Sequence, residues 1–290
     1  AKQKNVDAIH PGYGFLAENS EFVRKCEENG IAFIGPSADI MDKMGDKINS
    51  KKVAHAADVP TIPGVDKVIE TVEEAKKVAD YVGYPVMVKA SNGGGGRGMS
   101  VVYNEKDLAL EYETACSESR KAFGKAVIFI EKYIVDPKHI EVQILGDKEG
   151  NIVHLYERDC SVQRRHQKII EYAPAFSLPK EVRENICNDA VKIAKSVGYV
   201  NAGTLEFLVD AEGNHYFIEM NPRVQVEHTV TEEVTGIDIV QSQILIAEGY
   251  TLDSEEIDIK SQESVKISGF SIQCRITTED PKNNFMPDTG

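Results

Sequence analysis

The chain has 290 residues, of which 41% are hydrophobic, so it can bury two or three packed units. Its 33 Lys and Arg against 47 Asp and Glu give a net charge of -14, which argues against a nucleic-acid or anionic-membrane partner. No apolar run approaches transmembrane length, and no signal peptide precedes the first element. The five scattered cysteines lack CxxC spacing, which favours a reducing cytoplasm over a disulfide framework or a zinc site.

Residues 1–60 alternate short apolar runs with amphipathic segments, a pattern typical of an α/β unit. Strands are predicted near 6–9 and 31–34, with a helix near 20–29 between them that ends at Gly30. Two prolines and a glycine within 60–64 cannot continue a helix, so we place a domain boundary there.

Residues 61–133 predict a small unit of sheet and helices. A capping box at 71–74 opens a helix that Gly83 ends, and a second helix covers 104–123. Strands are expected at 85–90, 99–103 and 126–130. Residues 134–290 predict longer strands joined by hairpins, at 140–145, 152–156, 205–209 and 216–220, with helices near 179–197 and 237–248.

The run KASNGGGGRG at 89–98 lies between two predicted strands. Its glycines allow backbone N–H groups to approach an anion, and Lys89 adds a point charge, so the run predicts a phosphate lid. It lacks the spacing of a Walker motif or of GxGxxG, and an ordinary flexible turn is the alternative.

A register argument brings Glu206 opposite Glu219. If 211–214 form a four-residue loop, Leu205 faces Met220, Phe207 faces Ile218 and Val209 faces Tyr216, which gives one apolar face. The two glutamates then share the other face with Asn221, and they repel unless a cation lies between them. Hard oxygen ligands favour Mg²⁺ or Mn²⁺; a carboxylate pair neutralised by a nearby Lys or Arg is the alternative.

Polar side chains alternate along 219–227. An extended backbone would direct all of them to one side, with an apolar face opposite, which indicates a site; a solvated edge strand is the alternative. The alternating residues are Glu219, Asn221, Arg223, Gln225 and Glu227.

A basic run at 158–168 predicts a local anion trap in an otherwise acidic chain, unless it is a solvated face. The turn at 10–19 and Lys47 in the sequence Gly45-Asp-Lys-Ile are equally compatible with purely structural roles.

These motifs, in this order, resemble the biotin carboxylase component of biotin-dependent carboxylases, a branch of the ATP-grasp superfamily. The likeness covers essentially the whole chain and rests on HPGYGFLAEN, MGDK, KASNGGGGRGM, EKY, ERDCSVQRRHQK, FIEMNPRVQVEH and CRITTEDP. The resemblance implies an α/β (α+β) ATP-grasp fold. It divides into a truncated N-terminal α/β domain with a connecting helix (1–60), a lid subdomain (61–133) and a truncated C-terminal mixed-sheet catalytic domain (134–290).

The resemblance also implies roles for individual residues. Glu206, Glu219 and Asn221 match the metal ligands, Glu227 the base that deprotonates bicarbonate, and Arg275 the group that stabilises the biotin enolate. Lys168, Arg223, Gln225 and Val226 match the bicarbonate pocket, with Lys168 and Arg223 also counted as catalytic. The matches to ATP-binding positions are Lys47, Lys89, Gly93, Gly94, Gly95, Gly96, Glu131, His139, Gln163 and His166.

The implied reaction is that of an ATP-dependent carbon–nitrogen ligase: bicarbonate attacks the γ-phosphoryl group of ATP, and carboxyphosphate then supplies CO₂ to biotin. The implied cofactors are ATP and Mg²⁺ or Mn²⁺. Biotin is a substrate on a separate carrier domain, a carboxyltransferase domain belongs to the same protein, and the full-length enzyme is expected to be a homo-oligomer.

Among these carboxylases, Pro222, Thr229 and the ending ITTEDP…PDTG resemble the pyruvate carboxylases. Three alternatives stay open: the biotin carboxylase of an acetyl-CoA or propionyl-CoA carboxylase, another ATP-grasp ligase, and a catalytically silent nucleotide-binding fragment. We expect sequence to be missing on both sides, and the isolated fragment to be poorly active.

Overall fold

The computed structural model describes the chain except for residues 66, 91–98, 125, 165–166 and 289–290, and except for the side chains of 47, 122, 123 and 287. The helices are α1 (Ser20–Glu28), α2 (Ala38–Gly45), α3 (Lys47–Ala56), α4 (Val72–Val82), α5 (Glu105–Phe123), α6 (Lys180–Ser196), α7 (His228–Thr235) and α8 (Ile239–Glu248), with 3-10 turns at Lys2–Lys4, Gln262–Ser264 and Pro281–Asn283. The strands are β1 (Ala8–Ile9), β2 (Ala32–Phe33), β3 (Val86–Ala90), β4 (Met99–Val102), β5 (Ile128–Lys132), β6 (Lys138–Gly146), β7 (Ile152–Arg164), β8 (Gln167–Ala173), β9 (Asn201–Val209), β10 (His215–Asn221), β11 (Ser271–Cys274), β12 (Glu279–Asp280) and β13 (Met286–Pro287).

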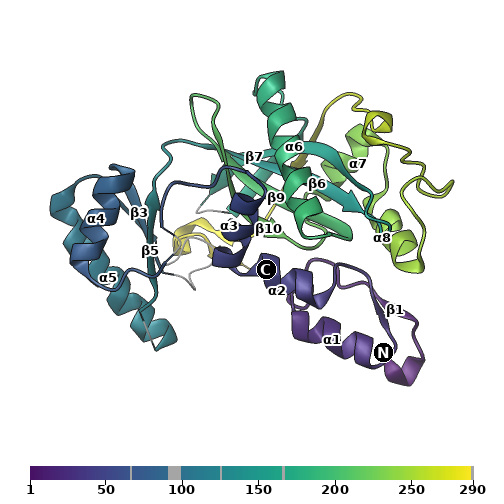
Figure 1. Cartoon of the computed structure of the whole chain (residues 1–290), viewed down its shortest axis with the longest axis horizontal. Coiled ribbons are helices and arrows are strands. Elements are labelled where there is room, and N and C mark those ends of the chain that lie inside the picture. The colour runs from purple at the N-terminus through teal and green to yellow at the C-terminus, as the bar shows by residue number, and fades with distance from the viewer. Residues whose placement is uncertain (66, 91–98, 125, 165–166, 289–290) are drawn as a thin grey trace.

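Three groups of elements make up the molecule. The antiparallel sheet β4-β3-β5 lies with α4 and α5 at the left of Figure 1, and the short parallel pair β1–β2 lies with α1 and α2 at the lower right. The third group is built on a six-stranded sheet in the order β10-β9-β6-β7-β8-β11. Within the described residues, no helix is long and apolar enough to cross a membrane.

The six-stranded sheet buries one face against helices. Ile140, Val142 and Phe207 on this face pack with residues of α6 such as Ile186 and Ile193, and the connecting helix α3 adds Ala54 to the same core. The small sheet has a separate core, built from β3, β5 and the inner faces of α4 and α5. The helices predicted near 20–29, 71–83, 104–123, 179–197 and 237–248 are confirmed, and α3 lies where the connecting helix is expected, whereas α2, α7, β8 and β11 were not predicted.

Every strand pairing in the described part of the large sheet is antiparallel, while the isolated bridge of Thr61 to Phe217 at its β10 edge is parallel. Short loops join β6 to β7, β7 to β8 and β9 to β10, which allows only antiparallel pairing of these neighbours, because a parallel pair needs a crossover of a dozen residues or more.

The predicted register of the β9–β10 hairpin is correct only in its second half. Glu219 pairs with Glu206 and Met220 with Leu205, as expected, but Phe217 pairs with Phe207, and His215 with Val209. A bulge between Phe217 and Glu219 absorbs the one-residue difference. The packing explains the bulge, because both phenylalanine rings are fully buried and lie 5.8 Å apart in the core.

The predicted connection at 60–64 packs against both sheets. Thr61 forms a bridge with Phe217 of β10, and Gly64 forms one with Glu131 of β5. A Cβ at Gly64 would lie 3.0 Å from both Glu131 Cβ and Ile130 O, so a larger residue would push this segment away from β5. The connection therefore fixes the distance between the two sheets.

Candidate active site

A cavity of about 1100 Å³ lies between the small sheet and the face of the large sheet opposite α6. Its walls include every predicted site residue whose side chain the structure describes. These residues are Lys89, Glu131, His139, Gln163, Lys168, Glu206, Glu219, Asn221, Arg223, Gln225, Val226, Glu227 and Arg275. Gly93 to Gly96, His166 and the side chain of Lys47 lie outside the described part, so the predicted lid and two predicted ATP contacts stay predictions.

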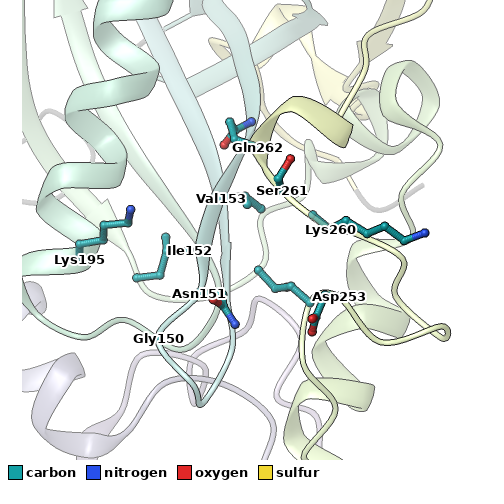
Figure 2. A pocket seen from close by; sticks show the side chains of 11 residues that line it. Gly150, Asn151, Ile152, Val153, Lys195, Asp253, Lys260, Ser261 and Gln262 are labelled. Atoms are coloured by element: carbon teal, nitrogen blue, oxygen red, sulfur yellow. The ribbon is translucent and has the colours of Figure 1, made fainter.

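A second cavity of about 300 Å³ lies elsewhere, at the β6–β7 turn and the segment 252–262 (Figure 2). Its polar residue Gln262 is already bonded to the β7 backbone at His154, with distances of 2.8 Å and 2.9 Å. The side chain of Lys260 extends away from the cavity (Figure 2), 3.4 Å from Asp258. The larger cavity is therefore the candidate site.

A row of charged side chains crosses four strands at the larger cavity; Glu206 and Glu219 line the cavity, and Glu141 and Arg158 are fully buried. Glu141 of β6 is opposite Arg158 of β7 on one side and Glu206 of β9 on the other, and Glu206 is opposite Glu219 of β10. Directly opposed residues share a face of a sheet, so antiparallel pairing gathers residues that lie far apart in the chain. The same alignment repeats one step along, with Gln143, Thr204 and Asn221.

Lys168 lies among three carboxylates of this row and its surroundings. Its Nζ forms an ion pair with Glu141, is 2.9 Å from Glu206 Oε1 and is 3.0 Å from Glu227 Oε1. Burial alone would raise the pKa of Glu206, but the hydrogen bond with His139 and the charge of Lys168 lower it well below its ordinary value. Burial opposes ionisation of Glu227 as well, but Lys168 and Arg158 lower the pKa of that carboxyl. Neutralisation of Glu206 by a lysine, the alternative left open above, is therefore present in the structure.

Arg158 is fully buried, so it is wrong to count it in a solvent-facing anion trap. Its guanidinium donates to Glu141 at 3.2 Å, to Gln143 at 2.9 Å and to Thr231 at 3.0 Å. It also donates to Gln225 Oε1 at 2.9 Å, so the Gln225 amide group can donate its Nε2 to Glu206 at 3.1 Å. Arg158 thus compensates buried negative charge and orients Gln225.

The extended backbone predicted along 219–227 ends at Asn221, where β10 ends before Pro222. The polar side chains still meet, but by a turn, because Glu227 is the N-cap residue of α7. Gln225 and Glu227 are only 3% and 2% exposed. Arg223 turns back instead, donating to Asn221 Oδ1 at 3.0 Å and to Glu18 at 2.6 Å.

At the small-sheet end of the cavity, lysines outnumber glutamates, which is the reverse of the arrangement around Lys168. Glu131 on β5 accepts from Lys51 of α3 at 2.9 Å and also pairs with Lys89 of β3. Burial by itself would raise the pKa of Glu131, but the two lysines lower it, so the carboxylate is ionised at neutral pH. Two ammonium groups against one carboxylate leave one positive charge, which suits an anionic phosphate.

The site also contains carboxylates suited to a metal ion. Two groupings place ligand atoms within 4.8 Å of one another: His139 with Glu141 and Glu206, and Cys160 with Glu141 and Glu227. The predicted metal set of Glu206, Glu219 and Asn221 shares only Glu206 with them. Glu219 is the cross-strand partner of Glu206, so this carboxylate pair also fits a hard cation. Asn221 instead donates its Nδ2 to Glu206 Oε1 at 2.8 Å, and its oxygen accepts from Arg223.

Glu141, Lys51 and Glu171 are site residues that the sequence predictions missed. Glu141 could have been found, because the alternation Ile140-Glu141-Val142-Gln143 places it on the polar face of its strand. Lys51 lies one helical turn after Lys47, a weaker signal. Glu171 follows two apolar residues in β8, and nothing in its local pattern separates it from an ordinary strand residue.

Comparison with known proteins identifies the class of this arrangement. Residues 46–255 match the family described as carbamoyl-phosphate synthase L chain, ATP binding domain, and residues 1–41 match the biotin carboxylase N-terminal domain. A biotin carboxylase–βγ-ATP complex from Campylobacter jejuni is similar in structure, with a TM-score of 0.90 and 53% identity over 99% of this chain and 63% of that one. The fold is thus that of an ATP-grasp domain.

Curated relatives narrow the class further. The chain is 57% identical to pyruvate carboxylase of Bacillus subtilis and 54% identical to the mitochondrial pyruvate carboxylase of Homo sapiens, in each case over all 290 residues. It spans only about a quarter of the length of these relatives, 25% and 24%. A Hydrogenobacter thermophilus 2-oxoglutarate carboxylase domain, described as a dimer with MgADP, ADP and bicarbonate, has a TM-score of 0.90 and 55% identity over 99% of this chain and 62% of that one. The chain belongs to the family of the carbamoyl-phosphate synthase L chain, ATP binding domain, and its first 41 residues match the biotin carboxylase N-terminal domain.

Proposed function

We propose that this chain catalyses the ATP-dependent carboxylation of biotin by bicarbonate, as the first half-reaction of a pyruvate carboxylase. The observation that carries the proposal is one cavity with opposite charge at its two ends: two lysines around Glu131, and a row of glutamates around Lys168. The first end suits the phosphates of ATP, and the second suits a divalent cation with bicarbonate beside it.

The first chemical step uses Glu227 as a base. Its lowered pKa keeps it ionised, so it can accept the proton of bicarbonate, and the bicarbonate oxygen can attack the γ-phosphorus of ATP with ADP leaving. Lys168 and Gln225, which both contact Glu206, hold the bicarbonate in place. Glu206, Glu219 and Asn221 would hold Mg²⁺ or Mn²⁺, which when bound neutralises charge on the phosphates.

The second step transfers the carboxyl group. Carboxyphosphate breaks into CO₂ and phosphate, the phosphate takes the ureido N–H proton of biotin, and the nitrogen attacks CO₂ to give carboxybiotin. Arg275, at the edge of the cavity, supplies donors to the developing negative oxygen of biotin.

The domain division at 60/61 and 133/134 is also a proposal, supported by the separate cores of the small unit and the large sheet. We further propose the biotinylated carrier domain and the carboxyltransferase domain as partners, and a homo-oligomeric full-length enzyme. Pyruvate as the final acceptor is supported by the pyruvate carboxylases among the relatives. A cytoplasmic location is supported by the five free thiols.

The test is ATP cleavage by the full-length protein, measured with and without bicarbonate and free biotin. We expect cleavage to require bicarbonate and to rise with biotin, and carboxybiotin to form. Arg275→Ala should lose the biotin stimulation but keep the biotin-independent cleavage. ATP cleavage that ignores both bicarbonate and biotin would refute the proposal and favour another ATP-grasp ligase, and no nucleotide turnover at all would favour a silent domain.

A further inference from the structure

The turn at 10–19 belongs to the N-terminal part of the chain but reaches the larger cavity. Tyr13 is one of the residues that line this cavity, and Glu18 accepts from Arg223 Nε at 2.6 Å. Arg223 is part of the proposed bicarbonate pocket, whereas the turn has no role in the mechanism given above. The shape of the site beside Arg223 therefore depends on where this turn is held.

The contacts at the cavity are too weak to hold the turn by themselves. The Glu18 side chain is 45% exposed, and an ion pair this exposed contributes little to stability. Packing adds little as well, because the larger apolar side chains Tyr13, Phe15 and Leu16 are all exposed. Ala17 is buried, but its side chain is a single methyl group. The turn therefore needs an anchor elsewhere.

His10, at the start of the turn, is fixed in one tautomer by its partners. Gly12 N donates to His10 Nδ1 at 3.1 Å, and a backbone N–H can only donate, so Nδ1 is the acceptor. The proton of the neutral ring is then on Nε2, which donates to Gln243 Oε1 of α8 at 3.1 Å. One imidazole thus shapes the turn and ties it to α8, a helix that packs against the large sheet.

Gln243 continues this connection to the sheet. Its Nε2 donates to Asn201 Oδ1 at 2.8 Å, and Asn201 Nδ2 donates back to Gln243 O at 3.0 Å. Ala202 N also donates to Asn201 Oδ1, at 2.9 Å, so a backbone N–H fixes the direction of the hydrogen bonds at this end too. Gln243 and Asn201 are only 2% and 1% exposed, so water does not compete for their hydrogen bonds.

The backbone of Asn201 shows that this network holds a strained position. Its φ of 79° lies in the left-handed region, which few residues other than glycine adopt. Asn201 is the first residue of β9, the strand that carries Glu206. A strained conformation persists only where its surroundings over-determine it, and such conformations cluster at functional sites. The network therefore indicates a function beyond the stability of one turn.

We propose that His10 is a positioning residue for the bicarbonate end of the cavity, a role that rests on the proposed function. Through Gln243 it anchors the turn to α8 and β9, and the anchored turn holds Glu18 against Arg223. The lysines of the opposite end of the cavity are on α3 and β3, outside this network. Loss of the anchor should therefore weaken the use of bicarbonate more than the use of ATP.

The experiment compares His10→Asn with the wild-type full-length protein. Asn places an oxygen near the position of Nδ1, so Gly12 keeps its acceptor, but no group reaches Gln243. Because one neutral hydrogen bond is lost, the KM for bicarbonate should rise by about 5-fold, while the KM for ATP should stay within about 2-fold. His10→Gln returns an N–H near the position of Nε2 and should show a smaller rise. Hydrogen exchange at the amides of 10–19 should become faster in His10→Asn and stay unchanged in β3 and β5.

His215→Asn is the matched control. It makes the same substitution and removes a hydrogen bond of 2.7 Å to Asp189, but His215 is not among the described residues that line the cavity. This variant should leave both KM values unchanged. An unchanged KM for bicarbonate in His10→Asn, or an equal rise in both KM values, would overturn the proposal, because either result describes a structural role alone.

A failure of the proposed function gives a different result. A wild-type protein without bicarbonate-dependent ATP cleavage would refute the proposed function itself. Hydrogen exchange at 10–19 that is the same in His10→Asn and in wild type would overturn the anchor whatever reaction the protein catalyses.

Discussion

The two ends of the cavity use the same pair of side-chain types in opposite ratio. On the small sheet, Glu131 lies between Lys51 and Lys89; on the large sheet, Lys168 lies among three glutamates. At each end the single group of opposite charge offsets only part of the charge of its neighbours. The difference shows that the net local charge, and not the number of charged residues, determines which end of the cavity suits phosphate and which end suits a cation.

The largest effect is expected at the glutamate-rich end, from Glu227→Gln. The amide keeps the size of the side chain but cannot accept the bicarbonate proton, so kcat for bicarbonate-dependent ATP cleavage should fall by about 100-fold or more. Steady-state kinetics at saturating ATP and bicarbonate measure the loss.

Glu233→Gln provides the control for that variant. It makes the same chemical change on the exposed side of α7, six residues further on, and should leave the rate unchanged. Undiminished turnover in Glu227→Gln would show that some other group is the base.

Removing the buried cation beneath the same end should reduce stability. Arg158→Met leaves Glu141 buried with Lys168 as its remaining permanently charged partner in the described part of the chain, and breaking a buried ion pair costs about 3–5 kcal/mol of unfolding free energy. Urea unfolding followed by circular dichroism gives the value.

The double variant Arg158→Met with Glu141→Gln tests the cause. Because it removes the uncompensated charge along with its partner, it should be more stable than Arg158→Met alone. A double variant as unstable as the single one would show that Arg158 acts through packing and not through charge.

The sequence could predict the parts of this site that depend on strands that follow one another in the chain. The Glu206–Glu219 pair followed from one hairpin, although the bulge after Phe217 was not foreseen, because it depends on how two phenylalanines pack in the core. Glu141 and Arg158 join that row only because β6 pairs with β9 and with β7. The order of strands in a sheet cannot be predicted from the hydrophobic periodicity of each strand.

The positions of Glu171 and of the segment after Pro222 could not be predicted from local sequence patterns either. Glu171 meets Arg275 because two segments about 100 residues apart become neighbouring strands, which no spacing rule reports. Alternation correctly selected Gln225 and Glu227, but for a geometric reason that is wrong, since a turn and a helix start bring them to the cavity.

A smaller effect is expected at the lysine-rich end. Lys89→Met removes one of the two ammonium groups beside Glu131, and the loss of one charged phosphate contact should raise the KM for ATP by about 10-fold. Lys106→Met, on the exposed side of α5, should leave the KM unchanged. An equal KM in both variants would mean that Lys51 alone supplies the charge.

The smallest effect is a pH dependence of stability that belongs to Glu131. Its pKa in the folded protein lies below the ordinary value of 4.5, in spite of burial, because of Lys89 and Lys51. The unfolded chain therefore takes up this proton at a higher pH than the folded one, so the stabilisation is complete above about 4.5 and is lost as the pH falls through the lower folded value. Melting temperatures of wild-type protein and Glu131→Gln, recorded from pH 7 downward, should begin to converge below about pH 4.5 and meet once the pH is below the folded pKa. If the difference in melting temperature between the two proteins instead stays constant with pH, Glu131 stabilises the fold by packing and not through its charge interaction with Lys51 and Lys89.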